Sequence, residues 1–132
     1  MSDAMQVLKT AAISVLEAHP VLATELTGIY DGPPPRAAFP YVSIADGISG
    51  DWSTKTAPGR EIRLALNVWD DGEQASRLSS LIAHVEDAVA AMPRDLPRWR
   101  IASLVFLRSM IVRDAAGPWA GLVEYRVRML AQ

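Results

Sequence analysis

Two histidines are the residues of this sequence best suited to acid–base or metal chemistry. A neutral imidazole can act as a general base or as a metal ligand. His19 and His84 are far apart along the chain, however, and give no ligand spacing such as His-x-x-x-His. His19 stands beside Pro20 at an expected helix end, and His84 has Glu86 and Asp87 nearby at offsets that we interpret as non-facing. The histidines therefore predict neither a catalytic nor a metal site.

Three carboxylates, Asp70, Asp71 and Glu73, could bind a hard cation, because such ions prefer oxygen ligands. They also stand where a helix is expected to begin, and acids there accept free amide hydrogens and complement the helix dipole. We therefore interpret them as capping residues. Serines follow within the same helix, but there is neither a Gly-x-Ser-x-Gly elbow nor a Gly-x-x-x-x-Gly-Lys phosphate loop. The sequence thus predicts no catalytic residue, no cofactor and no metal, and hence not an enzyme.

The remaining candidates are aromatic and basic residues of the kinds that protein interfaces favour. Trp52 lies in a polar loop and Trp119 in an expected turn. Arg126 and Arg128 lie opposite the apolar row of the last expected strand. Alternatively, each tryptophan folds back on the domain and the arginines form a solvated face. The sequence leaves both alternatives open.

Length and composition predict one small folded body, residues 1–132, since most compact domains have about 100–150 residues. Half of the residues are apolar and 21% are charged, as in ordinary globular proteins. The formal net charge of -2 predicts no general attraction to nucleic acid or to anionic membranes. The absence of cysteine excludes disulfides and thiolate sites and fits a reducing cytosol. The first twenty residues contain neither an export signal nor a membrane span.

The elements that must position these residues follow from hydrophobic periodicity. Apolar residues at three- and four-residue spacing predict helices, and alternating apolar and polar residues predict half-buried antiparallel strands. In chain order, the predicted segments are a helix over 2–19, a short helical piece that ends at Gly28, a rigid proline-rich loop over 31–36, strands over 41–48 and 61–69, a helix over 70–92, and strands over 100–112 and 122–129.

The order helix, hairpin, helix, hairpin predicts an α+β fold, an antiparallel sheet of about four strands with two main helices packed on one face. Ser2 or Asp3 is expected to cap the first helix. The hairpin tips would be residues 50–59 and 114–118. The sheet face away from the helices would present charged and aromatic side chains, namely Glu61, Arg63, Trp69, Glu124, Arg126 and Arg128.

Five short pieces follow one another in a specific order after the N-terminal helix. They are Gly28-Ile29-Tyr30, Phe39-Pro40-Tyr41-Val42 at the start of a strand, Asp51-Trp52-Ser53-Thr54-Lys55 in a loop, Val68-Trp69 before Asp71-Gly72 and a helix, and Gly121-Leu122-Val123-Glu124-Tyr125-Arg126-Val127 in the last hairpin. In this order and spacing, nearly the whole chain resembles the tail terminator, or tail completion, proteins of long-tailed phages and of phage-derived gene transfer agents.

This resemblance implies a single tail-terminator-like domain that forms a ring of six at the head-proximal end of a tail tube, stops tube growth and joins the tail to the head. It implies no catalytic residue. The partners would be copies of itself, the tail tube protein, a head-completion protein, and DNA that passes through the lumen without sequence-specific binding. The expected location is a phage or gene transfer agent particle assembled in the host cytoplasm. The alternatives are a head-completion protein of the same junction and a small soluble α+β binding module or enzyme subunit.

Simple geometry is compatible with a ring, because six bodies of about 35 Å diameter enclose a hole roughly as wide as one of them. A head-to-tail ring uses two different surfaces of each subunit. We expect the loop over 50–59 to reach a neighbouring subunit or the tube. In that loop region Trp52 would be the anchor, and Lys55 and Arg60 would pair with acids. We also expect Arg126 and Arg128 to meet acidic partners at a subunit interface.

Overall fold

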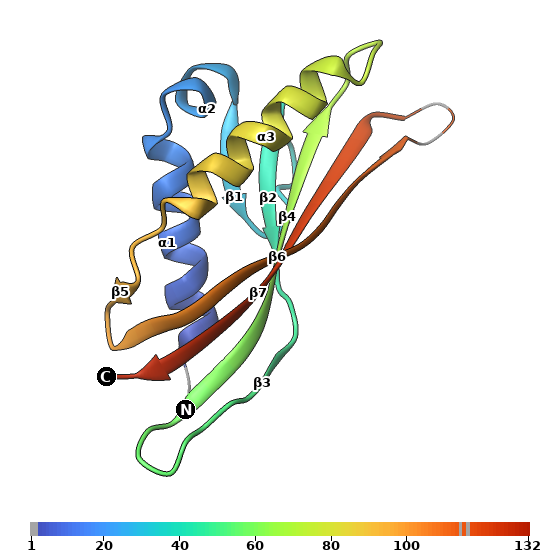
Figure 1. Ribbon diagram of the computed structural model, residues 1–132. Coiled ribbons are helices and arrows are strands. Elements are labelled where there is room, and N and C mark those ends of the chain that lie inside the picture. The colour runs from blue at the N-terminus through green and yellow to red at the C-terminus, as the bar shows by residue number, and fades with distance from the viewer. Residues whose placement is uncertain (1–2, 114, 116) are drawn as a thin grey trace.

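The structure is a computed structural model that describes residues 3–113, 115 and 117–132. Two long helices, α1 and α3, pack on one face of a curled sheet, and the short helix α2 contacts both of them (Figure 1). The elements of the described residues are α1 (Ala4–Ala18), α2 (Pro20–Glu25), β1 (Gly28–Asp31), β2 (Tyr41–Ala45), β3 (Ser49–Asp51), β4 (Gly59–Asp70), α3 (Ser76–Ala90), β5 (Asp95–Leu96), β6 (Trp99–Arg113) and β7 (Trp119–Ala131).

The sheet is wider than the predicted four strands. Within the described residues it has seven strands in the order β1-β2-β4-β7-β6-β5, with β3 paired to β4 off this path. The strands that the prediction missed, β1, β3 and β5, have two to four residues each, too few for a readable alternation. The stretch from Gly28, where a helical piece was expected to end, is a strand that pairs in parallel with β2, and the preceding helix already ends at Glu25.

Both predicted hairpins are confirmed. β2 pairs antiparallel with β4, and β6 pairs antiparallel with β7. The two hairpins meet where β4 pairs with β7, which places Glu61 opposite Arg128 and Arg63 opposite Arg126. Residues directly opposite one another in an antiparallel pair share a face, so the predicted charged face is also confirmed.

The second hairpin tip differs from the prediction at Trp119. Residues 114 and 116 of the predicted turn lie outside the described residues. Trp119 is not a turn residue, because it begins β7, and its Nε1 donates to the carbonyl oxygen of Gly72 at 2.9 Å. The ring therefore connects the start of the last strand to the segment that precedes α3.

The acids expected to cap helices have other partners. Asp3 precedes α1 without capping it, because its carboxylate accepts from Nε1 of Trp99 at 2.9 Å and pairs with Arg98. Ser2, the alternative cap, lies outside the described residues. Helix α3 begins at Ser76 and has no side-chain cap, so the expected helix start at Asp70 was wrong. Asp70 is instead the last residue of β4, fully buried and paired with Arg77.

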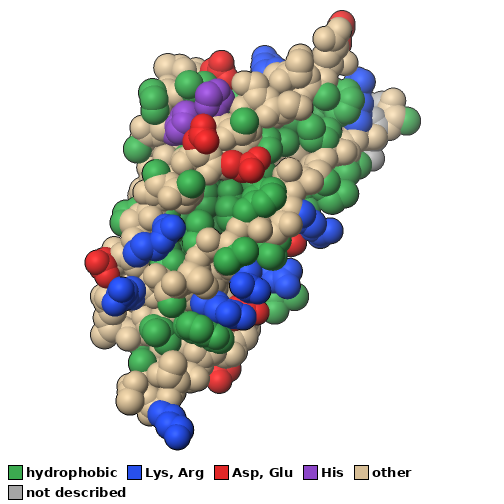
Figure 2. Space-filling model, in the orientation of Figure 1, with side chains coloured by type: hydrophobic (Ala, Val, Ile, Leu, Met, Phe, Trp, Pro, Cys, Tyr) green, Lys and Arg blue, Asp and Glu red, His purple; other side chains and the backbone are tan. Residues whose placement is uncertain are grey.

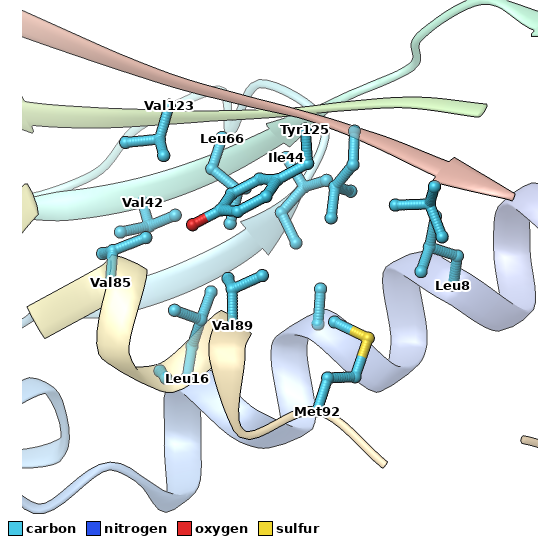
Figure 3. Packing of buried hydrophobic residues seen from close by; sticks show 14 of the residues in the cluster. Leu8, Leu16, Val42, Ile44, Leu66, Val85, Val89, Met92, Val123 and Tyr125 are labelled. Carbon is cyan, nitrogen blue, oxygen red and sulfur yellow. The ribbon is translucent and has the colours of Figure 1, made fainter. Parts of the chain in front are cut away.

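The core lies between the two long helices and the inner face of the sheet (Figure 3). Leu8 and Leu16 of α1, with Val85 and Val89 of α3, point toward the alternate residues of β2, β4 and β7. Burial raises the pKa of the Tyr125 hydroxyl within this core, and the negative charges of α3 add to the effect. None of the helices in the described residues is long and apolar enough to cross a membrane.

One glycine sets the distance between α3 and the sheet. A Cβ at Gly121 in β7 would lie 2.5 Å from Cδ1 of Ile82 and 3.2 Å from Cδ1 of Leu78. A larger residue at this position would therefore push the helix away from the strand. The long helices lie on one face of the sheet (Figure 1), and the charged residues that pair between β4 and β7 lie on the opposite face.

Candidate functional site

Trp52 and Arg128, both predicted interface residues, contact each other. The Arg128 guanidinium lies 5.4 Å from the centroid of the Trp52 ring, a cation–π arrangement. Its Nε donates to a carboxylate oxygen of Glu61 at 2.8 Å. This hydrogen bond holds the pKa of Glu61 below its usual value. Trp52 therefore folds back partly onto the sheet, in agreement with one of the two alternatives for the tryptophans, and keeps part of its ring exposed.

The loop that contains Trp52 is held by its own hydrogen bonds. The hydroxyl of Thr54 accepts from the amide of Ala57 at 3.0 Å, and the amide of Gly59 donates to the hydroxyl of Ser53 at 3.0 Å. Gly59 is required for this turn, because a Cβ there would lie 2.3 Å from the carbonyl oxygen of Trp52. Lys55 stands exposed at the tip and forms no ion pair with the described residues. The loop thus exposes the Lys55 ammonium group at its tip, and hydrogen bonds hold the residues beneath it.

Arg60 is separated from these residues by strand alternation. It lies opposite Asp51 in the β3–β4 pairing, one position before Glu61. Successive side chains of a strand point to opposite faces, so Arg60 belongs to the face opposite that of Glu61 and Arg128. The structure therefore brings Trp52 and Arg128 together and places Arg60 elsewhere.

Arg126 and Arg128 share a face but differ in their partners. Arg128 is paired with Glu61 within the chain. Arg126 lies opposite Arg63, and its Nε is buried without a hydrogen-bond partner among the described residues. An unsatisfied buried donor costs roughly 1–3 kcal/mol. Within the described residues, Arg128 therefore forms an ion pair and Arg126 forms none.

Strand β6 presents a long apolar edge. Its outer side pairs with β5 only at Trp99 and Arg100, so the rest of that edge has no strand partner among the described residues. The hairpin of β6 and β7 runs diagonally beside α3 (Figure 1), and hydrophobic side chains lie along this side of the molecule (Figure 2). The exposed apolar residues of this strand are Val105, Phe106, Met110, Ile111 and Val112. Such an edge is a template for pairing with another chain.

A second unpartnered surface lies on the helical side. A groove of about 700 Å³ runs between α1 and the segment that precedes β6, and its lining includes the apolar residues Val7, Ala11, Val15, Leu96 and Pro97. Asp3 and Arg98, which pair with each other, stand at one part of its wall. An apolar groove of this kind fits an apolar protein segment better than a charged ligand.

The fold also brings the two histidines together. The ring centroids of His19 and His84 lie 5.2 Å apart, and one ligand atom from each lies within 4.8 Å of the other and of an Asp87 oxygen. Ligand spacing along the chain could not predict this cluster, because His19 and His84 come from different elements. The prediction that Asp87 does not face His84 was wrong, because residues three apart on a helix are neighbours. That offset can be read in the sequence.

A family model described as "Tail completion protein gp17" matches residues 10–130. A search of curated proteins finds no match. A chain of the structure entitled "Virion of native gene transfer agent (GTA) particle" is 29% identical, with a TM-score of 0.82 over 98% of this chain and 100% of that chain.

A second solved structure, that of the bacteriophage SPP1 gp17 protein, is 21% identical, with a TM-score of 0.67 over 96% of this chain and 91% of that chain. At this identity the likeness supports the fold alone. The family model, in contrast, spans the chain from within α1 to Leu130, one residue before the end of β7. The chain therefore belongs to the tail completion protein family that this gp17 model describes.

Proposed function

We propose that this protein is a structural subunit at the head-proximal end of a phage-type tail, where it ends growth of the tail tube and joins the tail to the head. The single observation that supports this role best is the family match over residues 10–130. The protein acts in the particle itself, by contact with other particle proteins and without catalysing a reaction. Its position in the tail makes the tail tube protein and a head-completion protein its neighbours.

The subunit works as a ring of identical copies, which we take to be a hexamer. A ring of this kind needs two different surfaces on each subunit. The exposed edge of β6 and the apolar groove beside α1 are two such surfaces, formed by different elements. An exposed apolar strand edge favours aggregation. A second copy that covers this edge in a closed ring prevents such aggregation and also adds contact area.

Charged residues of the sheet and loop supplement these apolar surfaces. Neither Lys55 at the loop tip nor Arg126 on the sheet forms an ion pair within the described chain, so acids of a neighbouring subunit or of the tube would pair with them. Trp52 acts as an anchor beside Arg128. Arg60, exposed in part on the other face, contributes to a separate contact.

DNA passes through the ring without sequence-specific binding. The formal net charge of -2 gives the subunit no strong attraction for the phosphate backbone. A strongly basic lumen would hold the DNA and slow its passage, whereas a nearly neutral subunit allows it to move. The ring therefore serves as a passage and a joint.

Deletion of the gene from the particle-producing strain tests this function. We expect tails of abnormal length and particles without joined tails in electron micrographs, and expression of the wild-type chain from a plasmid should restore normal particles. Tails of normal length that fail to join heads would instead identify a head-completion protein. Normal particles from the deletion strain would refute both roles.

A further inference from the structure

Three metal-ligating side chains converge at the outer end of the helical layer. His19 precedes α2, whereas His84 and Asp87 lie three residues apart on α3. One ligand atom of each lies within 4.8 Å of the other two, and Figure 2 shows the two imidazoles side by side with an acidic side chain next to them. We propose that His19, His84 and Asp87 form a binding site for a divalent transition metal, with Zn²⁺ as the ion that suits them best.

The ligand types select the class of metal. Two imidazoles and one carboxylate form a three-ligand zinc set in which a water completes the tetrahedron. Mg²⁺ and Ca²⁺ prefer sites made mainly of oxygen ligands, and this chain has no cysteine to favour softer ions. Cu²⁺ and Ni²⁺ also bind imidazole, so selectivity among these metals would depend on availability.

The distances require only a small closure. Zinc bonds of about 2.0–2.1 Å in a tetrahedron place the ligand atoms roughly 3.3 Å apart. The ligand atoms, within 4.8 Å of one another, must therefore approach by at most about 1.5 Å. The Asp87 side chain is exposed, and the two imidazoles are half-buried, one within α3 and the other immediately before α2. We expect rotation of the three side chains to supply this closure.

The hydrogen bonds of His19 identify the nitrogen that would bind. Its Nδ1 accepts from the amides of Val21 and Leu22 at 3.3 and 3.4 Å, so a neutral ring has its proton on Nε2. A metal at Nε2 displaces that proton to Nδ1, which then no longer accepts. Binding thus exchanges two long hydrogen bonds at the start of α2 for one metal bond, and the amides of Val21 and Leu22 report it.

Such a metal would link the start of α2 to α3. These two helices are in contact, but they are separated in the chain by the first hairpin. Because α2 leads directly into the edge strand β1, the metal would also fix that edge relative to the helical layer. The site is independent of the proposed role in tail assembly, since it requires only the folded chain.

Titration of the purified, tag-free full-length chain with ZnCl₂ tests the site by calorimetry. We expect one zinc per chain and an increase in Tm. His84→Ala and Asp87→Asn should each weaken zinc binding by about tenfold or more. The matched control is Glu86→Gln, which removes the same charge from the next helix position and should bind zinc like the wild type. Zinc should also shift the NMR amide signals of Val21 and Leu22.

Several results would overturn the proposal. One is a wild-type chain that binds no zinc at millimolar concentration. Another is wild-type affinity in both His84→Ala and Asp87→Asn, and a third is an equal loss in Glu86→Gln and Asp87→Asn. Circular dichroism of the metal-free variants checks that they fold, and His84→Gln replaces His84→Ala if the latter does not. None of these measurements depends on tail assembly. A negative result for zinc binding would therefore leave the proposed function unaffected.

Discussion

Replacing Asp70 by Asn removes one buried charge while keeping the shape of the side chain. The carboxylate of Asp70 accepts from Nε of Arg77 at 3.0 and 3.1 Å and also pairs with the terminal Nη2. Backbone amides of Asp71 and Gly72 also donate to it. Asparagine keeps one oxygen for such donors, but its NH₂ group cannot accept from the guanidinium. The substitution therefore isolates the ion pair that joins the end of β4 to the first turn of α3.

The expected loss of stability follows from the burial of the two partners. Removing one partner of a fully buried ion pair costs roughly 3–5 kcal/mol. Here the side chain of Arg77 is 50% exposed, so the freed guanidinium regains water and the loss falls to about 2 kcal/mol. For a domain of this size, 1 kcal/mol corresponds to roughly 3–5 °C. We expect the Tm of Asp70→Asn to be about 6–10 °C below that of the wild type at pH 7.

The same ion pair gives a pH dependence with a definite sign. Hydrogen bonds from Arg77 hold the pKa of Asp70 below its usual value, against the opposing effect of burial. A carboxyl with a lowered folded pKa stabilises the fold fully above its unfolded pKa and loses this contribution as the pH falls through the folded value. The difference in stability between the wild type and Asp70→Asn should therefore begin to narrow below about pH 4.

Thermal unfolding followed by circular dichroism, at neutral pH and at a series of acid values, measures both effects. Asp71→Asn is the matched control, because Asp71 is 61% exposed and its oxygen lies 3.6 Å from the Arg77 Nη2. A surface pair of this kind contributes less than about 0.5 kcal/mol. Equal effects of the two variants, or a loss in Asp70→Asn that persists undiminished in acid, would refute the reasoning.

Four further substitutions test the proposed interfaces and another ion pair. Trp52→Ala should remove about 1 kcal/mol of stability by losing its contact with Arg128, and should weaken ring assembly while the monomer stays folded. Unchanged light scattering at high concentration and unchanged particle yield would contradict the anchor role. Arg126→Glu should reduce assembly more than it reduces stability, because the Nε of Arg126 has no hydrogen-bond partner within the described chain. Arg128→Glu should first reduce stability, because it breaks the hydrogen bond to Glu61. Particles that form normally with Arg126→Glu would remove it from the interface. Lys9→Met should change the free energy of unfolding by less than about 1 kcal/mol, since the partners Asp31 and Asp46 are 35% and 82% exposed and regain water. A loss above about 3 kcal/mol in urea unfolding would show that this buried cation stabilises the fold strongly.

The long elements could be predicted from the sequence because each has many repeats of its pattern. The alternation of β4 and the apolar stripe of α3 repeat through 12 and 15 residues, and Pro20 marks the end of α1. Short strands have no such repetition, so the parallel strand β1 was read as the end of a helix. The start of α3 was misplaced because an acid before a helix has the same pattern whether it caps the helix or pairs with an arginine inside it.

The alternation of apolar and polar residues along the strands predicts that the charged residues share one face, but it does not predict which of them form ion pairs. The bond between Arg128 and Glu61 depends on the register of β4 against β7, and a shift of two residues would keep every face while changing every partner. The approach of His19 to His84 depends similarly on how α2 packs against α3. Sequence spacing reports neighbours on one element, whereas both of these contacts join different elements.

Strand β6 shows a different limit of the alternation rule. Its pattern is mixed in part because two irregularities, between Ile101 and Ser103 and between Phe106 and Arg108, shift the register and reverse which residues face the core. Beyond the second irregularity, neighbouring apolar residues such as Ile111 and Val112 are exposed on both faces. Burial within the monomer does not account for apolar residues on both faces of a projecting strand, whereas burial by a second molecule does. In a subunit built for assembly, the loss of alternation outside the core therefore supports placing a contact between copies at this strand.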